Sequence, residues 1–224
     1  MIIRKKSLQL SFPEQQDYWN RIATKKTFNF PFYLDLFKQY SKKSYKVLDY
    51  GCGYGRILGY LVNAGFMHLY GIDFSDEMLK LTYKNYPTVN LSKNDSLFIP
   101  YDDNQFDTVI VCAVLGCNPN AQDQKLIIDE ISRVLKPRGV LYLADFLITN
   151  DKRNIIRYKN FPTSINFEYG VFELKNGVLI RHHAEIYIKK LLMMYEEKVF
   201  LKSVVKTMNG HQANGFTYIG INRK

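Results

Sequence analysis

Hydrophobic and polar residues alternate along the chain in two kinds of segment. Short β-branched and aliphatic runs, typical of buried strands, occur at 45–50, 68–73, 106–112 and 139–146, with a weaker run near 89–93. Segments with helical periodicity lie between them at 56–64, 75–84 and 121–135. Strands and helices that alternate in this way predict an α/β fold, doubly wound, with a parallel sheet covered on both faces.

The expected helices have recognisable boundaries. Ser75 is placed as an N-cap, and Asp76 and Glu77 follow it where the helix dipole favours negative charge. Gly65 provides a C-terminal stop for the helix at 56–64. In the segment 121–135, one apolar stripe is formed by Ile127, Ile131, Val134 and Leu135.

The pattern changes after residue 146. The segment 147–183 is too long for an ordinary connection between a strand and a helix. Within it, "LKNGVL" places Asn-Gly between two alternating runs, which predicts a β-hairpin. A helix then carries one apolar face, and alternating runs at 198–206 and 215–222 predict two further strands. The apolar face of this helix consists of Ile188, Leu191, Leu192 and Tyr195.

Composition agrees with one globular domain. The chain has 224 residues, of which 46% are hydrophobic, so it can bury a substantial core. Its amino terminus lacks the apolar region of a signal peptide, and no run approaches the length of a membrane span. We therefore expect a cytoplasmic protein without a membrane span. Three separated cysteines form no CxxC pair, which argues against a disulfide framework or a zinc site.

The net charge of +10 keeps a nucleic-acid partner open, although the charge is mostly dispersed lysine without a long basic run.

Candidate chemistry begins in "KVLDYGCGYGRILGYL". Gly51, Gly53 and Gly55 alternate behind a strand that contains Asp49, which lets a ligand approach the main chain closely. A dinucleotide fingerprint would have a third glycine where this sequence has Arg56. A carboxylate before the loop suits a ligand with ammonium and sulfonium charges better than one with two phosphates. These residues favour S-adenosylmethionine over NAD.

Four motifs together resemble the class I S-adenosylmethionine-dependent methyltransferases, over about residues 45–146. They are "VLDYGCGYG", "LYGIDFS", "NDSLFIPYDDNQFDTVIV" and "VLKPRGVLYLADF". In the last, Arg138 replaces a glycine of the family's turn. The resemblance implies a Rossmann-like methyltransferase fold with a seven-stranded, mostly parallel sheet whose last strand runs antiparallel.

The resemblance also implies site residues. Asp73 would bind both ribose hydroxyls and Phe74 would lie against the adenine. Asp95 would meet the adenine amino group, with Ser96 beside it. Cys52, within the glycine loop, and Cys112, at the end of the fourth strand, are expected to line the cofactor site. Tyr18, in an amino-terminal helix, is a candidate for the methionine carboxylate; packing beside Trp19 is the alternative.

We expect one methyltransferase domain over 1–224. Residues 1–40 would form an amino-terminal helical cap and 45–146 the cofactor-binding core. Residues 147–183 would be an insertion after strand 5, rich in aromatic residues, that acts as a lid over the acceptor; a dimer contact is the alternative. Residues 184–224 would add a helix and a strand hairpin.

The acceptor side is less specified. His183 and His182 precede the last helix, and Tyr158 lies in the expected lid. We take these three as candidate catalytic residues, because histidine can serve as a general base; a purely structural role remains open for each. After strand 4 the chain reads "CAVL" in place of an Asn/Asp-Pro-Pro-aromatic box, which argues against methylation of adenine amino groups.

The expected function is transfer of a methyl group from S-adenosylmethionine to an O or N atom of a small-molecule acceptor, with S-adenosylhomocysteine as product. An RNA-modifying methyltransferase and a non-catalytic cofactor-binding module are the alternatives. The chain would act as a monomer or homodimer.

Overall fold

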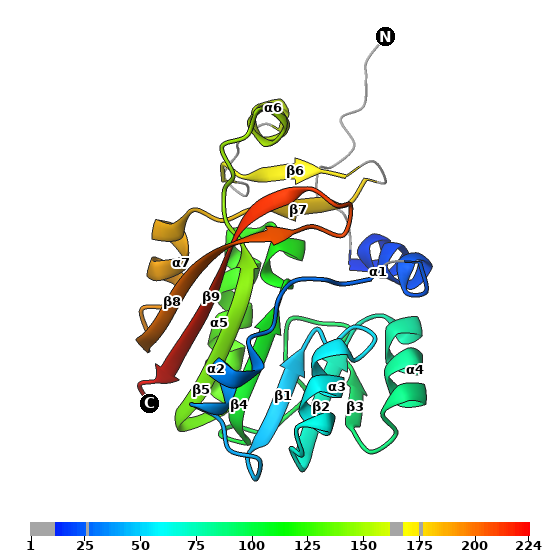
Figure 1. The fold of residues 1–224 in the computed structure, drawn as a ribbon, viewed down its shortest axis with the longest axis vertical. Helices are drawn as coiled ribbons and strands as arrows, with labels where there is room; N and C mark the ends of the chain where they lie inside the picture. Colours follow the sequence, from blue (N-terminus) through cyan, green and yellow to red (C-terminus); the bar gives the residue numbers. More distant parts are fainter. Residues whose placement is uncertain (1–11, 26, 162–167, 175–176) are drawn as a thin grey trace.

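A seven-stranded sheet organises the chain. A computed structural model describes residues 12–25, 27–161, 168–174 and 177–224 (Figure 1). The strands lie in the order β3-β2-β1-β4-β5-β9-β8, and β9 runs antiparallel to the other six. They are β1 Lys46–Tyr50, β2 His68–Asp73, β3 Asn90–Lys93, β4 Phe106–Cys112, β5 Leu135–Phe146, β8 Tyr195–Lys206 and β9 Gln212–Asn222. The predicted doubly wound sheet, with an antiparallel last strand, is confirmed.

Helices cover both faces of this sheet. Alternate residues of β5 point to opposite faces, as the period of a strand requires. Leu141 and Leu143 pack in the cluster that contains the apolar side of α5, whereas Tyr142 and Ala144 pack with α2 and α3. The helices of the sheet are α2 Leu34–Lys38, α3 Arg56–Asn63, α4 Asp76–Asn85, α5 Ala121–Val134 and α7 Glu185–Leu191. Within the described ranges, no helix has the length and apolar character needed to cross a membrane.

The predicted start of α4 is confirmed by its cap. The Ser75 hydroxyl accepts a hydrogen bond from the Met78 amide at 3.2 Å. This bond satisfies one of the amide groups that the first turn of a helix leaves without a partner. Asp76 and Glu77 follow in the first turn, where the helix dipole favours them.

Two helix ends differ from the prediction. Leu135 and Tyr195, expected as the last apolar residues of helices, instead begin β5 and β8. Both side chains are buried. The first residue of a strand and the last of a helix can face the same core, so the apolar stripe continues through the junction and does not mark it.

Additional elements lie beyond the carboxyl ends of the strands. Figure 1 shows α6 (Lys152–Asn160) and the antiparallel pair β6 (Val171–Glu173) and β7 (Leu179–Arg181) there, with α1 (Phe12–Ile22) beside them. The antiparallel pairing of β6 with β7 agrees with the hairpin predicted around "LKNGVL", of which residues 175–176 lie outside the described residues. The helix α6 was not expected from the pattern.

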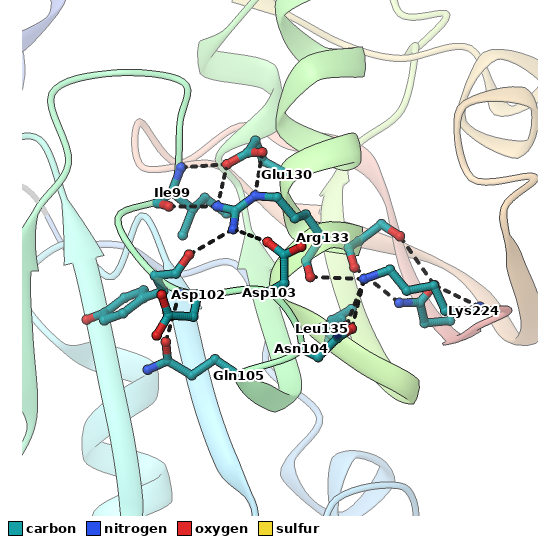
Figure 2. A network of polar contacts seen from close by, with 12 residues as sticks. Ile99, Asp102, Asp103, Asn104, Gln105, Glu130, Arg133, Leu135 and Lys224 are labelled. Carbon is teal, nitrogen blue, oxygen red and sulfur yellow. Dashed lines mark hydrogen bonds and ion pairs between the residues drawn. The ribbon is translucent and has the colours of Figure 1, made fainter.

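A polar network joins α5 to the loop before β4 and to the carboxyl terminus (Figure 2). The Arg133 guanidinium donates to Glu130, Asp103 and the main-chain oxygens of Ile99 and Tyr101, at 2.8–2.9 Å. All five N–H groups of the planar guanidinium therefore donate hydrogen bonds. The network fixes the 98–103 loop, which follows the cofactor-side residues after β3.

Replacing Arg133 should therefore destabilise the protein. We expect Arg133→Ala to lower the free energy of unfolding by about 1–3 kcal/mol, because partly buried acceptors lose charged donors. Urea unfolding measures the change. Lys125→Ala removes a single exposed ion pair, with Asp129, on the same helix and should change it by less than about 0.5 kcal/mol. Equal effects of the two substitutions would contradict the importance of the network.

The same network predicts a pH effect. Hydrogen bonds from Arg133 lower the pKa of Glu130 below its ordinary value of 4.5. A carboxyl whose pKa is lowered by folding stabilises the native state above its ordinary pKa and loses this contribution as pH falls. Glu130→Gln should therefore reduce stability at pH 7 more than at pH 3, measured by urea unfolding at both values.

Candidate functional site

A cavity of about 680 Å³ opens at the carboxyl ends of the strands. One part is lined by residues that follow β1, β2, β3 and β4, and the other by α1, α6, the β6–β7 hairpin and the loop between β8 and β9. Its volume lies within the range of roughly 300–1,000 Å³ typical of small-molecule sites. Parallel sheets place their ligands at this edge, near the reversal of strand order, which here lies between β1 and β4.

The glycine loop after β1 forms one wall. Gly51 and Gly53 line the cavity and have φ values of +73° and +56°, a conformation that disfavours side chains. A Cβ atom on Gly51 would also meet Val114 Cγ2 at 2.5 Å, and one on Gly53 would meet Phe28 Cε2 at 2.9 Å. A side chain at either position would therefore clash with neighbouring side chains, whether or not a ligand is bound. Gly55, the N-cap of α3, does not line the cavity.

Asp73, at the end of β2, holds the glycine loop in place through hydrogen bonds. One carboxylate oxygen accepts the Gly53 amide and the other accepts the Ser75 amide, both at 2.9 Å. The Asp73 main-chain oxygen accepts the Asn94 amide at 3.0 Å. The Phe74 amide also hydrogen-bonds this carboxylate. A carboxylate has about four lone-pair sites, so about one remains for a ligand hydroxyl. Asp73 lines the cavity, as its predicted role requires.

Asp49 and Arg56 place opposite charges in the same part of the cavity. Asp49 is 2% exposed, and burial raises the pKa of its carboxyl to about 7, while Arg56 acts in the opposite direction. Among the described residues, the Asp49 carboxylate has no hydrogen-bond or ion-pair partner, and Arg56 contacts only the Cys112 thiol, at 3.8 Å. Buried charges without partners are costly, which suits a ligand that supplies opposite charges.

The residues after β2 and β3 line the adjoining region. Phe74 and Ser96 line the cavity, in agreement with their predicted places. Asp95 is exposed and does not line it. Its neighbour Asn94, 8% exposed, does line it. The role expected of Asp95 thus stays a prediction, and Asn94 is the polar group that the structure places at this point.

The cysteines are packed as neutral thiols. Cys52 and Cys112 line the cavity, and burial raises the pKa of the Cys112 thiol to about 12 and that of Cys52 well above its ordinary value. Cys117, which also lines the cavity, has a raised pKa for the same reason. None is therefore activated as a nucleophile, since the thiolate is the reactive form.

These residues fit S-adenosylmethionine. Its ammonium and sulfonium charges match Asp49, its carboxylate matches Arg56, and a ribose hydroxyl matches the remaining acceptor site of Asp73. Phe74 provides an aromatic surface for the adenine. The carboxylate partner predicted from the sequence, Tyr18, is instead 5% exposed, packs edge-on against Trp19 and does not line the cavity.

A second buried carboxyl lies at the end of β5. Asp145 lines the cavity, is 1% exposed, and has a pKa raised by burial to about 7. The Gly116 amide donates to its Oδ2 atom at 2.9 Å and the Phe146 amide to its Oδ1 atom at 2.7 Å. A Cβ atom on Gly116 would meet the Arg181 main-chain oxygen at 2.8 Å and Asp145 Oδ1 at 3.1 Å. The absence of a side chain at Gly116 lets β7 and Asp145 approach each other.

The three predicted catalytic residues occupy different places. His182 lines the cavity, but Tyr158 and His183 do not. Burial lowers the pKa of His182 to about 3, so its ring is neutral. The Tyr158 hydroxyl lies 2.7 Å from His182 Nδ1 and accepts the Thr149 amide at 3.4 Å. A hydroxyl that accepts from Thr149 can donate its own proton to Nδ1, which leaves the ring proton on Nε2.

His183 is fully buried behind the cavity. Both of its ring nitrogens lack a hydrogen-bond partner within the described part of the chain, and Nε2 lies 4.0 Å from Asp145 Oδ2. Burial lowers the pKa of its imidazole well below the ordinary value. The structure therefore brings His183 next to a cavity residue and not into the cavity.

The aromatic residues of the expected lid divide in the same way. Phe172 lines the cavity, whereas Tyr158 and Phe161 are buried away from it and Tyr169 is 45% exposed. Phe167 lies outside the described residues.

Sequence reasoning missed several cavity residues. Asp145 could have been indicated by its position at the end of a strand. Arg153 and Arg157 could have been indicated by their i, i+4 spacing. Nothing in the local pattern indicates the β8–β9 loop residues Thr207, Met208 and Asn209, or Gln212 at the start of β9, which also line the cavity.

Comparisons with known proteins agree with this geometry. Residues 48–143 match the family described as "Methyltransferase domain". A demethylmenaquinone methyltransferase of Chlorobaculum tepidum is 28% identical over 148 residues, which are 64% of this chain and 57% of that protein.

Two solved structures resemble the chain. One of the S-adenosylmethionine-dependent methyltransferases of Methanosarcina mazei has a TM-score of 0.77 and 26% identity, over 84% of this chain and 96% of that one. The 1,6-didemethyltoxoflavin-N1-methyltransferase of Burkholderia thailandensis, solved with 1,6-didemethyltoxoflavin and S-adenosylhomocysteine, has a TM-score of 0.59 and 14% identity. The second match covers 94% of this chain and 79% of that one. The chain spans about half the length of the curated relatives it matches.

The contact of Gly51 with Val114 can be tested by a double-mutant cycle. Gly51→Ala should lower the free energy of unfolding by on the order of 2–4 kcal/mol, the sum of backbone strain and overpacking. Val114→Ala in that background should recover the overpacking part, as measured by urea unfolding.

Gly65→Ala is the control. Gly65 has a similar φ of +80°, but a Cβ atom there would meet Lys43 Nζ no closer than 3.4 Å. It should show the strain alone, about 1 kcal/mol. Additive effects of Gly51→Ala and Val114→Ala would contradict the contact.

Proposed function

Because residues 48–143 form a methyltransferase domain of the class I, S-adenosylmethionine-dependent type, we propose that the chain transfers the cofactor's methyl group to an O or N atom of a small molecule. The observation that carries this proposal is the continuous cavity. Its first part has the groups that suit the cofactor, and its second part is lined by the insertion after β5. The insertion would then serve as the cover of the acceptor, as expected from its length and aromatic content.

When bound, S-adenosylmethionine supplies an electrophilic methyl group on a sulfonium that leaves readily. The protein therefore has to hold an acceptor lone pair in line and keep water away. Aromatic residues from several elements provide a dry surface for this purpose. Besides Tyr50 and Phe74 on the cofactor side, those that line the cavity are Trp19, Phe28, Phe30, Phe146 and Phe172.

Asp145 is the group best placed to receive a proton from the acceptor. Its carboxyl is buried in the cavity wall, and its pKa of about 7 lets it accept a proton at neutral pH. The amides of Gly116 and Phe146 hold it in one orientation. We assign the base to Asp145 in preference to His182, whose pKa of about 3 makes it a poor base. His182 would orient the acceptor through Nε2–H.

Transfer to a carbon atom is a second candidate. The relative in Chlorobaculum tepidum is named as a demethylmenaquinone methyltransferase, a C-methylating enzyme. The apolar, aromatic lining would accommodate a quinone ring. The two candidates differ in the atom that receives the methyl group.

Titration and labelling test the function together. Calorimetry should show that S-adenosylhomocysteine binds, while NAD does not. Incubation with methyl-labelled S-adenosylmethionine and a metabolite extract should give a labelled small molecule, and the position of the label identifies the atom. Label in tRNA or rRNA, with binding that weakens steeply with salt, would favour the RNA alternative. Binding without any transfer would favour the non-catalytic module.

The assignment of Asp145 predicts a pH dependence. The transfer rate of the unaltered protein should rise with pH through about 7, as the Asp145 carboxylate forms. Asp145→Asn should remove this rise and lower the rate by about 10²–10⁴-fold, without changing the affinity for S-adenosylhomocysteine. Asp123→Asn, which removes another carboxyl at the cavity, should lower it by less than about threefold. An unchanged pH profile in Asp145→Asn would refute the assignment.

Stability provides a second readout for the same carboxyl. Folding raises the pKa of Asp145 from 3.8 to about 7, so the native state binds more protons than the unfolded chain between these values. Stability is therefore lost through this residue as pH rises from 4 to 7. Asp145→Asn should flatten that part of the stability curve, which shows that the variant is folded while its activity is measured.

A further inference from the structure

Two arginines of α6 face the acceptor part of the cavity. Arg153 and Arg157 are one helical turn apart, and both line the cavity together with Asn154 and His182. Residues at i and i+4 lie on the same side of a helix, so the two guanidinium groups can act on one ligand.

Neither arginine is neutralised by a carboxylate of the described residues. Within the described ranges, no carboxylate forms an ion pair with Arg153 or Arg157. Arg157 donates only a long hydrogen bond of 3.4 Å to Asn154 Oδ1 and lies over the Phe172 ring, 4.0 Å from its centroid. The sequence of residues 162–167, "PTSINF", contains no acidic residue either.

The acidic groups nearby form no ion pair with either arginine in the described part of the chain. Asp151 caps α6 and accepts hydrogen bonds from the Asn154 amide and from Asn154 Nδ2, at 3.1 and 2.6 Å. Asp145 accepts hydrogen bonds from the amides of Gly116 and Phe146. Asp123, at the start of α5, lines the same cavity, and among the described residues it forms no ion pair with either arginine.

The charge of the arginines reaches the cavity. After burial, Arg157 and Arg153 are the next causes that lower the pKa of His182, and Asp151 opposes them only weakly. Arg153 also lowers the pKa of Arg157, as a like charge does. Two like charges held close together at a partly buried surface are unfavourable unless an anion binds between them.

We propose that the methyl acceptor carries an anionic group, a carboxylate or a phosphate, which binds between Arg153 and Arg157. The guanidinium fork matches both kinds of anion in a bidentate manner. The His182 Nε2–H adds a neutral donor beside the pair. This inference rests on the proposed function, and it identifies the class of acceptor.

The aromatic groups around the arginines describe the rest of the acceptor. The His182 ring stacks on Phe146 with centroids 5.3 Å apart and meets Phe172 edge-on at 4.9 Å. Flat, apolar surfaces next to an anion site suit an aromatic acid or an aryl phosphate. A neutral quinone would leave both arginines without a partner.

The test uses probes that differ in charge at similar size. The full chain, saturated with S-adenosylhomocysteine, is titrated by calorimetry with 3-hydroxybenzoate, phenyl phosphate and the neutral 3-hydroxybenzamide. We expect one of the anions to bind at least about tenfold more tightly than the amide, since a charge-assisted hydrogen bond is worth roughly that factor. The better of the two anions shows whether the group is a carboxylate or a phosphate.

Substitutions locate the site. Arg153→Gln and Arg157→Gln should each weaken the anion by about tenfold, and the double variant should lose the preference over the amide. Lys159→Gln removes a charge from the exposed side of the same helix and should leave the preference intact. A preference that survives the double variant, or that Lys159→Gln reduces equally, would overturn the proposal. So would the absence of a preference for either anion in the unaltered protein.

A further arm separates this proposal from the proposed function. Inorganic phosphate needs no cofactor, and it should raise the melting temperature of the unaltered protein more than that of the double variant. If S-adenosylhomocysteine fails to bind, the proposed function is wrong, whereas the phosphate arm still reports on the arginines. If S-adenosylhomocysteine binds equally to all variants and phosphate distinguishes none of them, only the anion site is wrong.

Discussion

The Asp73 side chain is the constraint on which the cofactor half depends. Its carboxylate holds the glycine loop through Gly53 and the start of α4 through Ser75, while its main chain holds Asn94 after β3. Three loops that are distant in sequence therefore meet at one residue. Hydrogen bonds to a carboxylate are stronger than those between neutral groups, and here they are shielded from water. The walls of the cavity are thus arranged before any ligand arrives.

The cavity keeps charge where a protein interior would normally avoid it. Asp49 and Asp145 are both almost completely buried, and burial raises the pKa of each to about 7. The two carboxyl groups differ in the hydrogen bonds that they accept. Main-chain amides hold Asp145, whereas no described residue hydrogen-bonds to Asp49, which lies in the electrostatic field of Arg56. Hydrogen bonds that fix the orientation of a carboxyl suit a group that accepts a proton from one direction. A carboxyl without such bonds keeps its oxygens available to a charged ligand. The difference fits the two parts that we assign to them.

Sequence reasoning recovered what is local. The order of strands and helices, the cap at Ser75 and the cavity positions of Asp73 and Phe74 follow from motifs of a few residues. It could not settle what the tertiary arrangement decides. The choice of Asp95 over Asn94 depends on which way a loop turns, and the burial of His183 depends on the β6–β7 hairpin. The amphipathic helix α6 was missed because charged residues outnumber the apolar ones that would mark a buried face. Distant residues are needed to show that its arginines face a cavity.

The insertion leaves and rejoins the sheet at neighbouring points. The His183 amide donates to the Phe146 main-chain oxygen at 2.9 Å, although 36 residues separate them in the sequence. A segment with adjacent ends can be lengthened, shortened or exchanged at little entropic cost to the core. Evolution can therefore graft different acceptor-recognition modules between β5 and α7 of one cofactor scaffold. Related chains could share this methyl donor while diverging in what they modify.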